Sequence, residues 1–179
     1  MQLVAGQTAP NFSARDVRGN VISLRGFKDK KLALLFYRYA GCPFCQLNFH
    51  NFMREYPRYA EHGLNVIVFF QSPQESISRY ISSQNAPFAI VADPNKSIYL
   101  LYGVESSLLG LLRTIPETGR YLRDMLPSQG KIDGDFFLMP AGFLIDGSDF
   151  TIKKVHYATS LTDQISLQEI HEFLFDQSG

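Results

Sequence analysis

The chain has 179 residues, of which 45% are hydrophobic and 19% charged, which suits one hydrophobic core of ordinary size. Seventeen Lys and Arg residues balance 17 Asp and Glu residues, so no chain-wide positive charge favours binding to nucleic acid or to an anionic membrane. The two cysteines are too few for a secreted scaffold held by several disulfides. We therefore expect a single domain over residues 1–179.

No targeting segment is evident at the start of the sequence. The first ten residues contain no basic residue, and the longest apolar runs are far shorter than the ~18 residues that cross a membrane. The sequence thus predicts neither a signal peptide nor a transmembrane helix, and a reducing, cytoplasmic location is expected.

Short hydrophobic segments alternate with helix-start signals, as in α/β proteins. Residues 12–17 and 21–24 flank the turn signal Gly19-Asn20, which predicts a hairpin within an N-terminal extension, residues 1–28. Three longer apolar runs then predict strands buried on both faces. They are residues 31–39, 64–71 and 88–92.

The helices between these strands have recognisable N-termini. Ser72 begins a capping box with proline at the next position, and Asp93 likewise precedes a proline. Helical spacing predicts which side chains face inward. They are Ile77, Tyr80 and Ile81 in the first helix, and Ile98, Leu101 and Tyr102 in the second.

The C-terminal part predicts a second hairpin and a last helix. Residues 142–145 and 151–157 flank a turn, and we expect them to add antiparallel strands to the parallel sheet. A second capping box at Ser166 begins the helix. Its predicted buried residues are Leu167, Ile170, Phe173 and Leu174.

Residues 105–135 form an additional segment before this hairpin, and we expect it to be a helical insert of two short helices separated by Pro116. Its two apolar clusters are Leu108, Leu109, Leu111, Leu112 and Ile115, and then Tyr121, Leu122, Met125 and Leu126. We expect the leucines of the first cluster to cap the domain's own core, the alternative being an exposed surface for a partner.

Both cysteines lie in one motif, Cys42-Pro43-Phe44-Cys45, at the predicted boundary between a buried strand and a helix. Free N–H groups at a helix N-terminus stabilise a thiolate, and cysteines three residues apart on the first turn can form a disulfide. Cys45 shares the inward helix face with Phe49, whereas Cys42 precedes the helix and is expected to be reachable from solvent. The pattern predicts a redox-active dithiol in which Cys42 attacks and Cys45 resolves.

The two cysteines have two other possible uses. A zinc site would need about two further ligands, and the histidines are scattered in the sequence, at His50, His62, His156 and His171. Cysteines that merely pack in the core are the second alternative, although they are uncommon at a strand-to-helix boundary. We expect no metal and no cofactor.

Four motifs, in this order, resemble the AhpC/TSA superfamily, the peroxiredoxin-like branch of the thioredoxin fold. They are GQTAPNF, FYRYAGCPFC, VADPNKSIYLLYGV and AGFLID. The resemblance covers roughly residues 3–174, with residues 105–135 the least similar. It implies a thioredoxin-like three-layer α/β fold, with a mixed central sheet flanked by helices. It also implies an oxidoreductase whose partners are a thiol reductant and a disulfide or hydroperoxide substrate.

The peroxiredoxin loop Pro-x-x-x-Thr-x-x-Cys, laid on this chain, puts Arg38 at the proline, Cys42 at the threonine and Cys45 at the peroxidatic cysteine. This register supports an alternative, a thiol peroxidase in which Cys45 is oxidised to a sulfenic acid and Cys42 condenses with it. Pro140 stands where the family has a peroxide-orienting arginine. Arg38 could then supply positive charge to the thiolate. Three further candidates are Arg113, Arg120 and Arg123.

Compared with thioredoxins, Met139-Pro140 matches the site of a cis-proline beside the CxxC motif. A cis bond there would let the preceding backbone pair with an extended substrate. Gly41 replaces the usual tryptophan, and Phe36 stands near the place of a buried aspartate. The predicted active-site support residues are Arg38, Tyr39, Pro43, Phe44 and Pro140.

A third hypothesis makes the chain a non-enzymatic interaction module, in which the CxxC motif senses redox state and residues 105–135 bind a partner. A homodimer is an assembly that the chain could form. We expect neither nucleic acid nor membrane among its partners.

Overall fold

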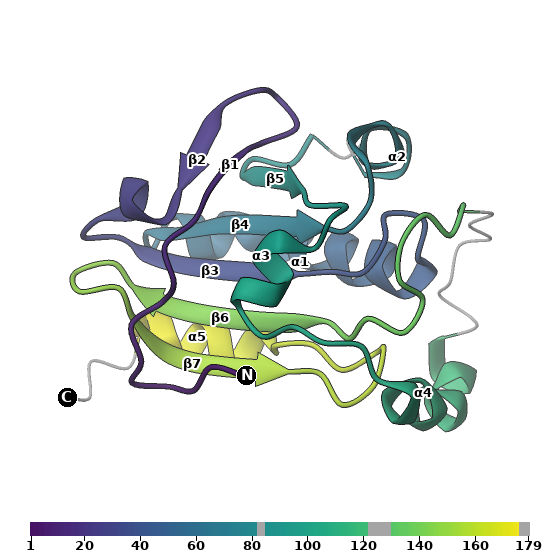
Figure 1. The fold of residues 1–179 in the computed structure, drawn as a ribbon. Coiled ribbons are helices and arrows are strands. Elements are labelled where there is room, and N and C mark those ends of the chain that lie inside the picture. The colour runs from purple at the N-terminus through teal and green to yellow at the C-terminus, as the bar shows by residue number, and fades with distance from the viewer. Residues whose placement is uncertain (82–84, 122–129, 176–179) are drawn as a thin grey trace.

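The sheet at the centre of the fold comprises β3 (Lys31–Phe36), β4 (Leu64–Phe70), β5 (Ala89–Ala92), β6 (Ala141–Asp146) and β7 (Thr151–Tyr157). In the computed structural model, which describes residues 1–81, 85–121 and 130–175, the side chains of 116–121 excepted, the strand order is β5-β4-β3-β6-β7 (Figure 1). β3, β4 and β5 are parallel, and β6 and β7 are antiparallel to their neighbours. The predicted α/β arrangement is confirmed.

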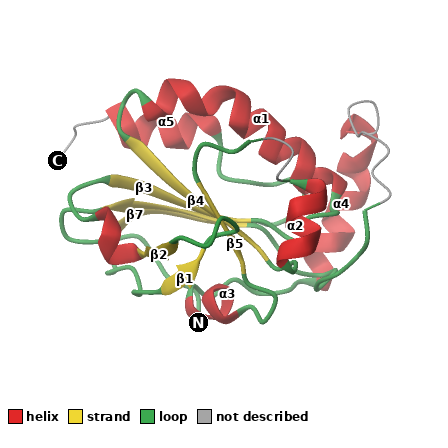
Figure 2. Ribbon diagram, turned by 90° about the horizontal axis from the view of Figure 1, so that it is seen from above, coloured by secondary structure: helices red, strands yellow, loops and turns green. Residues whose placement is uncertain are grey.

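Helices cover both faces of this sheet (Figure 2). On one face lie α1 (Pro43–Ala60) and α5 (Leu167–Phe175), and on the other lies α3 (Ser97–Leu101), together with η1 (Leu24–Phe27) and the predicted hairpin of β1 (Ser13–Arg15) and β2 (Val21–Ser23). α2 (Gln74–Tyr80) and α4 (Leu108–Tyr121) lie near the end of the sheet where β3 and β4 finish. In the described ranges, no helix is long and apolar enough to span a membrane.

β3 has the predicted burial on both faces, because its neighbours on either side are paired and helices cover the sheet. Ala33 and Leu35 pack in the core beneath α1 and α5, whereas Leu32 and Leu34 pack in the core on the other face. The strand ends at Phe36, earlier than predicted, and the chain then turns toward α1. The loop that carries the cysteines therefore lies at the carboxyl end of the central strand.

One of the three predicted helix caps is confirmed, since Ser166 forms its capping box with Glu169. The prediction for Asp93 is wrong in position, because α3 begins at Ser97 with Lys96 as its N-cap residue, although the Asp93 carboxylate accepts hydrogen bonds from the N–H groups of Ser97 and Ile98. The prediction for Ser72 is wrong, because α2 begins at Gln74 and makes no side-chain cap bond. The Ser72 hydroxyl instead bonds to distant segments, as described below.

Two inward-facing assignments are also wrong. Leu101 is 44% exposed, because α3 turns Tyr99 inward, where its hydroxyl donates to the Tyr37 carbonyl at 2.6 Å. Leu167 is 39% exposed at the start of α5. Ile98 and Ile170 are buried, as predicted.

The insert differs from the prediction in two ways. α4 continues past Pro116, since a proline removes one helical hydrogen bond and can kink a helix without ending it. The apolar side chains of α4 do not all cap the core, because the helix contacts the domain through Gly110 and Leu111. The exposed ones are Leu108, Leu109, Leu112 and Ile115. Most of the second predicted cluster, from Leu122 on, lies outside the described residues.

Candidate active site

The cysteine loop is fixed by its own backbone and by a neighbouring loop. Cys42 is the N-cap residue of α1, and Pro43 occupies the first helical position, where its missing N–H costs nothing. The Cys42 N–H donates to the Tyr39 carbonyl at 3.0 Å, and the Ala40 N–H donates to the Ser72 hydroxyl at 2.7 Å. The predicted position of the motif at a strand-to-helix boundary is thus confirmed.

Both cysteines are buried and reduced, and the exposed fraction of each is 0%. The expectation that solvent reaches Cys42 is wrong, because residues 130–136 cover the loop; we call this segment the strap. The backbones of Gly41 and Gly130 are in close contact, so that a Cβ atom added to Gly41 would lie 2.8 Å from the Gly130 Cα atom. Glycine is needed on both sides of this crossing.

Arg38 joins Cys42 to the strap. Its side chain is 1% exposed, and its Nη1 atom donates to the Cys42 sulfur at 3.3 Å. Its Nη2 atom donates to the Phe136 carbonyl. The guanidinium also lies over the rings of Tyr39 and Phe136, with its Cζ atom 5.1 and 5.2 Å from their centroids, where a cation–π attraction is expected.

The two sulfurs differ in their tendency to ionise. Burial opposes ionisation of Cys42, but the hydrogen bond from the Cys45 thiol and the positive charge of Arg38 outweigh it and lower the pKa of Cys42 to about 6. Burial, followed by the hydrogen bond to Cys42 and its negative charge, raises the pKa of Cys45 well above its usual value. The two shifts have opposite directions, so they favour Cys42 over Cys45 as the sulfur that ionises first.

Tyr39 borders the same site. Burial and the negative charge at Cys42 raise the pKa of Tyr39 to about 12, so its hydroxyl stays protonated and can act as a hydrogen-bond donor. Phe44, between the two cysteines, packs beside Met139 and Leu161 in a small separate cluster. These two support residues therefore contribute a polar group and an apolar anchor, respectively.

The predicted cis bond before Pro140 is wrong, since the peptide bond is trans. The backbone that precedes Pro140 is already paired within the chain. The Met139 N–H donates to the Glu105 carbonyl at 3.2 Å, and the Ser107 N–H donates to the Phe137 carbonyl at 2.8 Å. The groove that a substrate strand would occupy in a thioredoxin is thus filled by the start of the insert.

The structure does not place any of the other three candidate arginines beside the cysteines among the residues it describes. Arg113 lines a separate depression of about 380 Å³ that also includes Met139 and Pro140. The side chains of Arg120 and Arg123 lie outside the described residues. Among the predicted support residues, Arg38 makes a hydrogen bond to a cysteine sulfur.

Sequence reasoning missed the strap and its attachment to Ser72. The Ser72 hydroxyl donates to Asp133 Oδ1 at 2.6 Å while it accepts the Ala40 N–H, so it links the strap to the cysteine loop. Gly130 and Gly134 were the one available signal, because each marks a close approach, Gly134 to the side chain of Gln71. Nothing in the sequence shows which segments approach each other there.

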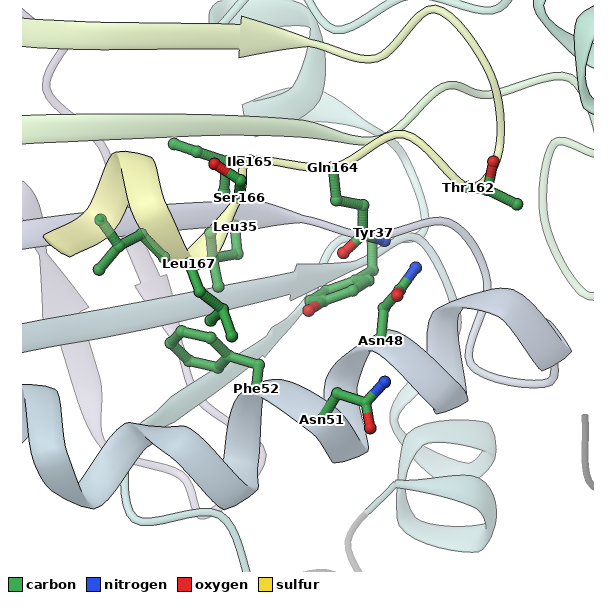
Figure 3. Close-up of a pocket in the computed structure, with 11 residues that line it drawn as sticks. Leu35, Tyr37, Asn48, Asn51, Phe52, Thr162, Gln164, Ile165, Ser166 and Leu167 are labelled. Atoms are coloured by element: carbon green, nitrogen blue, oxygen red, sulfur yellow. The ribbon is translucent and has the colours of Figure 1, made fainter. Parts of the chain in front are cut away.

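A cavity of about 250 Å³ lies between α1, the end of β3 and residues 162–167 (Figure 3). Asn48 and Asn51 extend from α1 toward it, and Gln164 extends from the opposite side. Tyr37 forms one wall, and burial raises the pKa of Tyr37. In the described ranges, no group of three or more His, Cys, Asp and Glu side chains could hold a metal ion.

Comparisons with known proteins agree with this geometry. The AhpC/TSA family model matches residues 5–148. "Peroxiredoxin Q, chloroplastic" of Triticum aestivum is 29% identical over 119 residues, covering 66% of this chain and 54% of the relative. "Thiol-disulfide oxidoreductase ResA" of Halalkalibacterium halodurans is 30% identical over 101 residues, which is 56% of this chain and 57% of the relative. The chain spans 54% to 64% of the length of the first four curated relatives it matches.

Solved structures show the same fold. Peroxidoxin BcpB from Mycobacterium tuberculosis superposes with a TM-score of 0.73 at 17% identity, over 99% of this chain and 100% of that one. A putative thiol:disulfide interchange protein DsbE from Chlorobium tepidum superposes with a TM-score of 0.65 at 19% identity, over 97% and 99% of the two chains. The thioredoxin-like fold implied by the sequence motifs is thereby confirmed.

Proposed function

Because the chain belongs to the AhpC/TSA family, we propose that it is a thiol redox enzyme, an oxidoreductase that cycles Cys42 and Cys45 between dithiol and disulfide. In this proposal Cys42 is the attacking thiolate and Cys45 is the resolving thiol. The electrons come from a thiol reductant, and a reducing compartment such as the cytoplasm would keep the pair in its dithiol form.

One contact carries the proposal, the donation from Arg38 Nη1 to the Cys42 sulfur at 3.3 Å. A buried guanidinium favours the anion, and thiolate is the nucleophilic form of cysteine. Cys45 lies on the first turn of the same helix and donates to the Cys42 sulfur, so it is placed to form the second bond of the cycle. In this proposal the nucleophile, Cys42, and the resolving thiol, Cys45, therefore have distinct roles.

The exchange reaction balances within this pair. The Cys42 thiolate attacks one sulfur of a substrate disulfide, a mixed disulfide forms, and the other substrate sulfur leaves as a thiolate. Cys45 then gives up its proton and attacks the Cys42 sulfur, which releases the second substrate thiolate. The products are a reduced substrate and the Cys42–Cys45 disulfide.

A hydroperoxide is the second candidate substrate, and the orphaned polar atoms of the site favour it. Arg38 Nε and Asp133 Oδ2 are buried and have no hydrogen-bond partner among the described residues. A hydroperoxide carries both an acceptor oxygen and a donor hydroxyl, so it could satisfy groups of either kind. The low pKa of the Cys42 thiol favours Cys42 over Cys45 as the sulfur that is oxidised first.

This reaction also balances. The Cys42 thiolate attacks the terminal peroxide oxygen, the S–O bond forms, and the O–O bond breaks. The alkoxide takes a proton from solvent to become an alcohol, and Cys42 becomes a sulfenic acid. Condensation with the Cys45 thiol then forms the disulfide and releases water.

Single Cys→Ser variants treated with oxidised glutathione or hydrogen peroxide, followed by mass mapping, test both versions. Cys45→Ser should accumulate a glutathione adduct or a sulfenic acid on Cys42, because the resolving thiol is gone. Cys42→Ser should leave Cys45 largely unmodified, and the wild type should form the internal disulfide. Full activity of Cys42→Ser toward either oxidant would contradict the assignment.

The third hypothesis of the sequence, a redox sensor without turnover, predicts a different result. Such a protein would form the disulfide once and change its association without multiple turnovers. Steady-state consumption of oxidant with dithiothreitol as reductant, compared with light scattering of the reduced and oxidised protein, separates the two.

A further inference from the structure

The strap defined above, residues 130–136, closes the site that the proposed function uses. Both sulfurs are completely buried, and no oxidant can contact Cys42 from the strap side without passing this segment. The crossing of Gly41 and Gly130 is a backbone contact, so no side-chain rotation opens it. Access for any reagent therefore requires the site to open, and a larger reagent requires a wider displacement of the strap.

Polar contacts on its outer side hold the strap in place. The Gln71 side chain makes two bonds to the backbone of Asp135, donating to its carbonyl at 2.9 Å and accepting its N–H at 2.7 Å. The Asp135 carboxylate pairs with Lys96 Nζ at 2.8 Å. Ser72 anchors Asp133, and the Tyr80 hydroxyl accepts the Lys131 N–H at 3.2 Å.

Little apolar burial adds to these anchors. Ile132 is 56% exposed and Phe136 is 39% exposed, and the side chains of Asp133 and Asp135 are half-buried. Segments held mainly by hydrogen bonds and by few buried apolar contacts open at low free-energy cost, since water replaces the bonds. The strap is thus closed in the ground state but separable from the rest of the fold.

The alternative approach of an extended protein substrate is also blocked. Such a substrate would pair with the backbone before Pro140, and there the Glu105 carbonyl and the Ser107 N–H already pair with Met139 and Phe137. The two observations are independent, because the strap covers the sulfur and residues 105–107 occupy the neighbouring strand edge.

We propose that the strap, anchored by Asp135 to Gln71 and Lys96, is a specificity-determining element that restricts Cys42 to low-molecular-weight oxidants and excludes disulfides of folded proteins. The inference rests on the proposed role of Cys42 as the attacking thiolate. It extends that role because it assigns the selection of substrates by size to the strap. Arg38 connects the two, since its side chain bonds both to the Cys42 sulfur and to the Phe136 carbonyl of the strap.

Two maleimides of equal chemistry and different size provide the test, because alkylation of Cys42 needs no turnover. The Cys45→Ser variant leaves a single thiol, which reacts either with N-ethylmaleimide or with a maleimide attached to a small folded protein. Asp135→Asn removes the charge that pairs with Lys96 yet keeps an acceptor oxygen. The matched control is Asp146→Asn, which breaks the Asp146–Lys153 pair at the opposite end of the sheet.

The small reagent should react faster than the large one, and the ratio of small to large rate constants should far exceed that of an unfolded cysteine peptide. Asp135→Asn should raise the rate of the large reagent about tenfold, as expected when one charge-assisted hydrogen bond is lost from an opening equilibrium, and Asp146→Asn should not. Lys96→Gln removes the other member of the same ion pair and should raise the rate of the large reagent to a similar extent. Agreement between the two variants would show that the lost ion pair, and not a folding defect of one variant, causes the increase.

A wild-type ratio equal to that of the peptide, or identical rates for Asp135→Asn and Asp146→Asn, would overturn the strap proposal while the role of Cys42 stands. A Cys42 that is unreactive to both reagents in every variant would overturn the proposed function and the strap proposal together.

Discussion

Arg38 is the charged residue whose side chain donates a hydrogen bond to the Cys42 sulfur. Its guanidinium donates to the Cys42 sulfur, and the pKa of that thiol is lowered from 9.0 to about 6. The Arg38→Met substitution keeps the length and apolar stem of the side chain but removes its charge and donors. The pKa of Cys42 should therefore rise.

The size of the rise follows from the contact. A hydrogen bond to a charged group is worth ~1.5–3 kcal/mol, and 1.36 kcal/mol corresponds to one pKa unit. The pKa of Cys42 should increase by about one to two units, to about 7 to 8. The hydrogen bond from Cys45 remains, which is why the shift should not reach the ordinary value.

The pH dependence of iodoacetamide alkylation measures this directly. In a Cys45→Ser background only Cys42 reacts, and the introduced hydroxyl keeps a donor next to its sulfur. At pH 6 the Arg38→Met variant should react more slowly than its parent. Well above pH 9 it should react faster, because a thiolate of higher pKa is the better nucleophile.

Arg113→Met is the matched control, since Arg113 is an exposed arginine on α4 with no bond to either sulfur in the described residues. Its alkylation midpoint should equal that of the parent. Arg38→Lys should fall between the parent and Arg38→Met, because lysine keeps the charge without the planar fork. An unchanged midpoint in Arg38→Met would refute the reasoning.

Three further predictions concern stability. Gly41→Ala places a Cβ atom 2.7 Å from the strap backbone and should lower the free energy of unfolding by about 1–3 kcal/mol. Gly26→Ala, whose added Cβ atom has its nearest neighbour at 3.7 Å, should leave this free energy nearly unchanged in urea unfolding. Equal effects of the two substitutions would contradict the close contact of Gly41 with the strap. Reduced wild-type protein should gain stability over Cys42→Ser as pH rises from about 6 toward 9, because the thiol ionises first in the folded state; a pH-independent difference between the urea midpoints would argue against a buried thiolate. Asp93→Ala should cost about 1–2 kcal/mol through the lost hydrogen bonds to the first turn of α3, and Asp93→Asn should cost less; thermal unfolding that ranks the two variants otherwise would count against these bonds.

Part of the fold could be predicted because its signals are local. The continuous apolar run of β3 and the capping box at Ser166 depend on residues near one another in sequence, and both are confirmed. Ser72 shows where such signals fail. The sequence predicts that its hydroxyl caps the helix that follows. In the structure this hydroxyl instead accepts the Ala40 N–H and donates to the Asp133 carboxylate, two groups that are distant in sequence.

The sequence by itself determined the sheet, the position of the CxxC motif at a helix N-terminus and the thiol chemistry that this position favours. Only the tertiary structure decided which charged group contacts Cys42 and which segment covers the two sulfurs. Arg38 and Phe136, 98 residues apart in sequence, meet over Cys42, and the insert closes the site that local pattern had predicted to be open. The physical reason is that burial and electrostatic contacts depend on distances in space, which residue spacing along a chain does not contain.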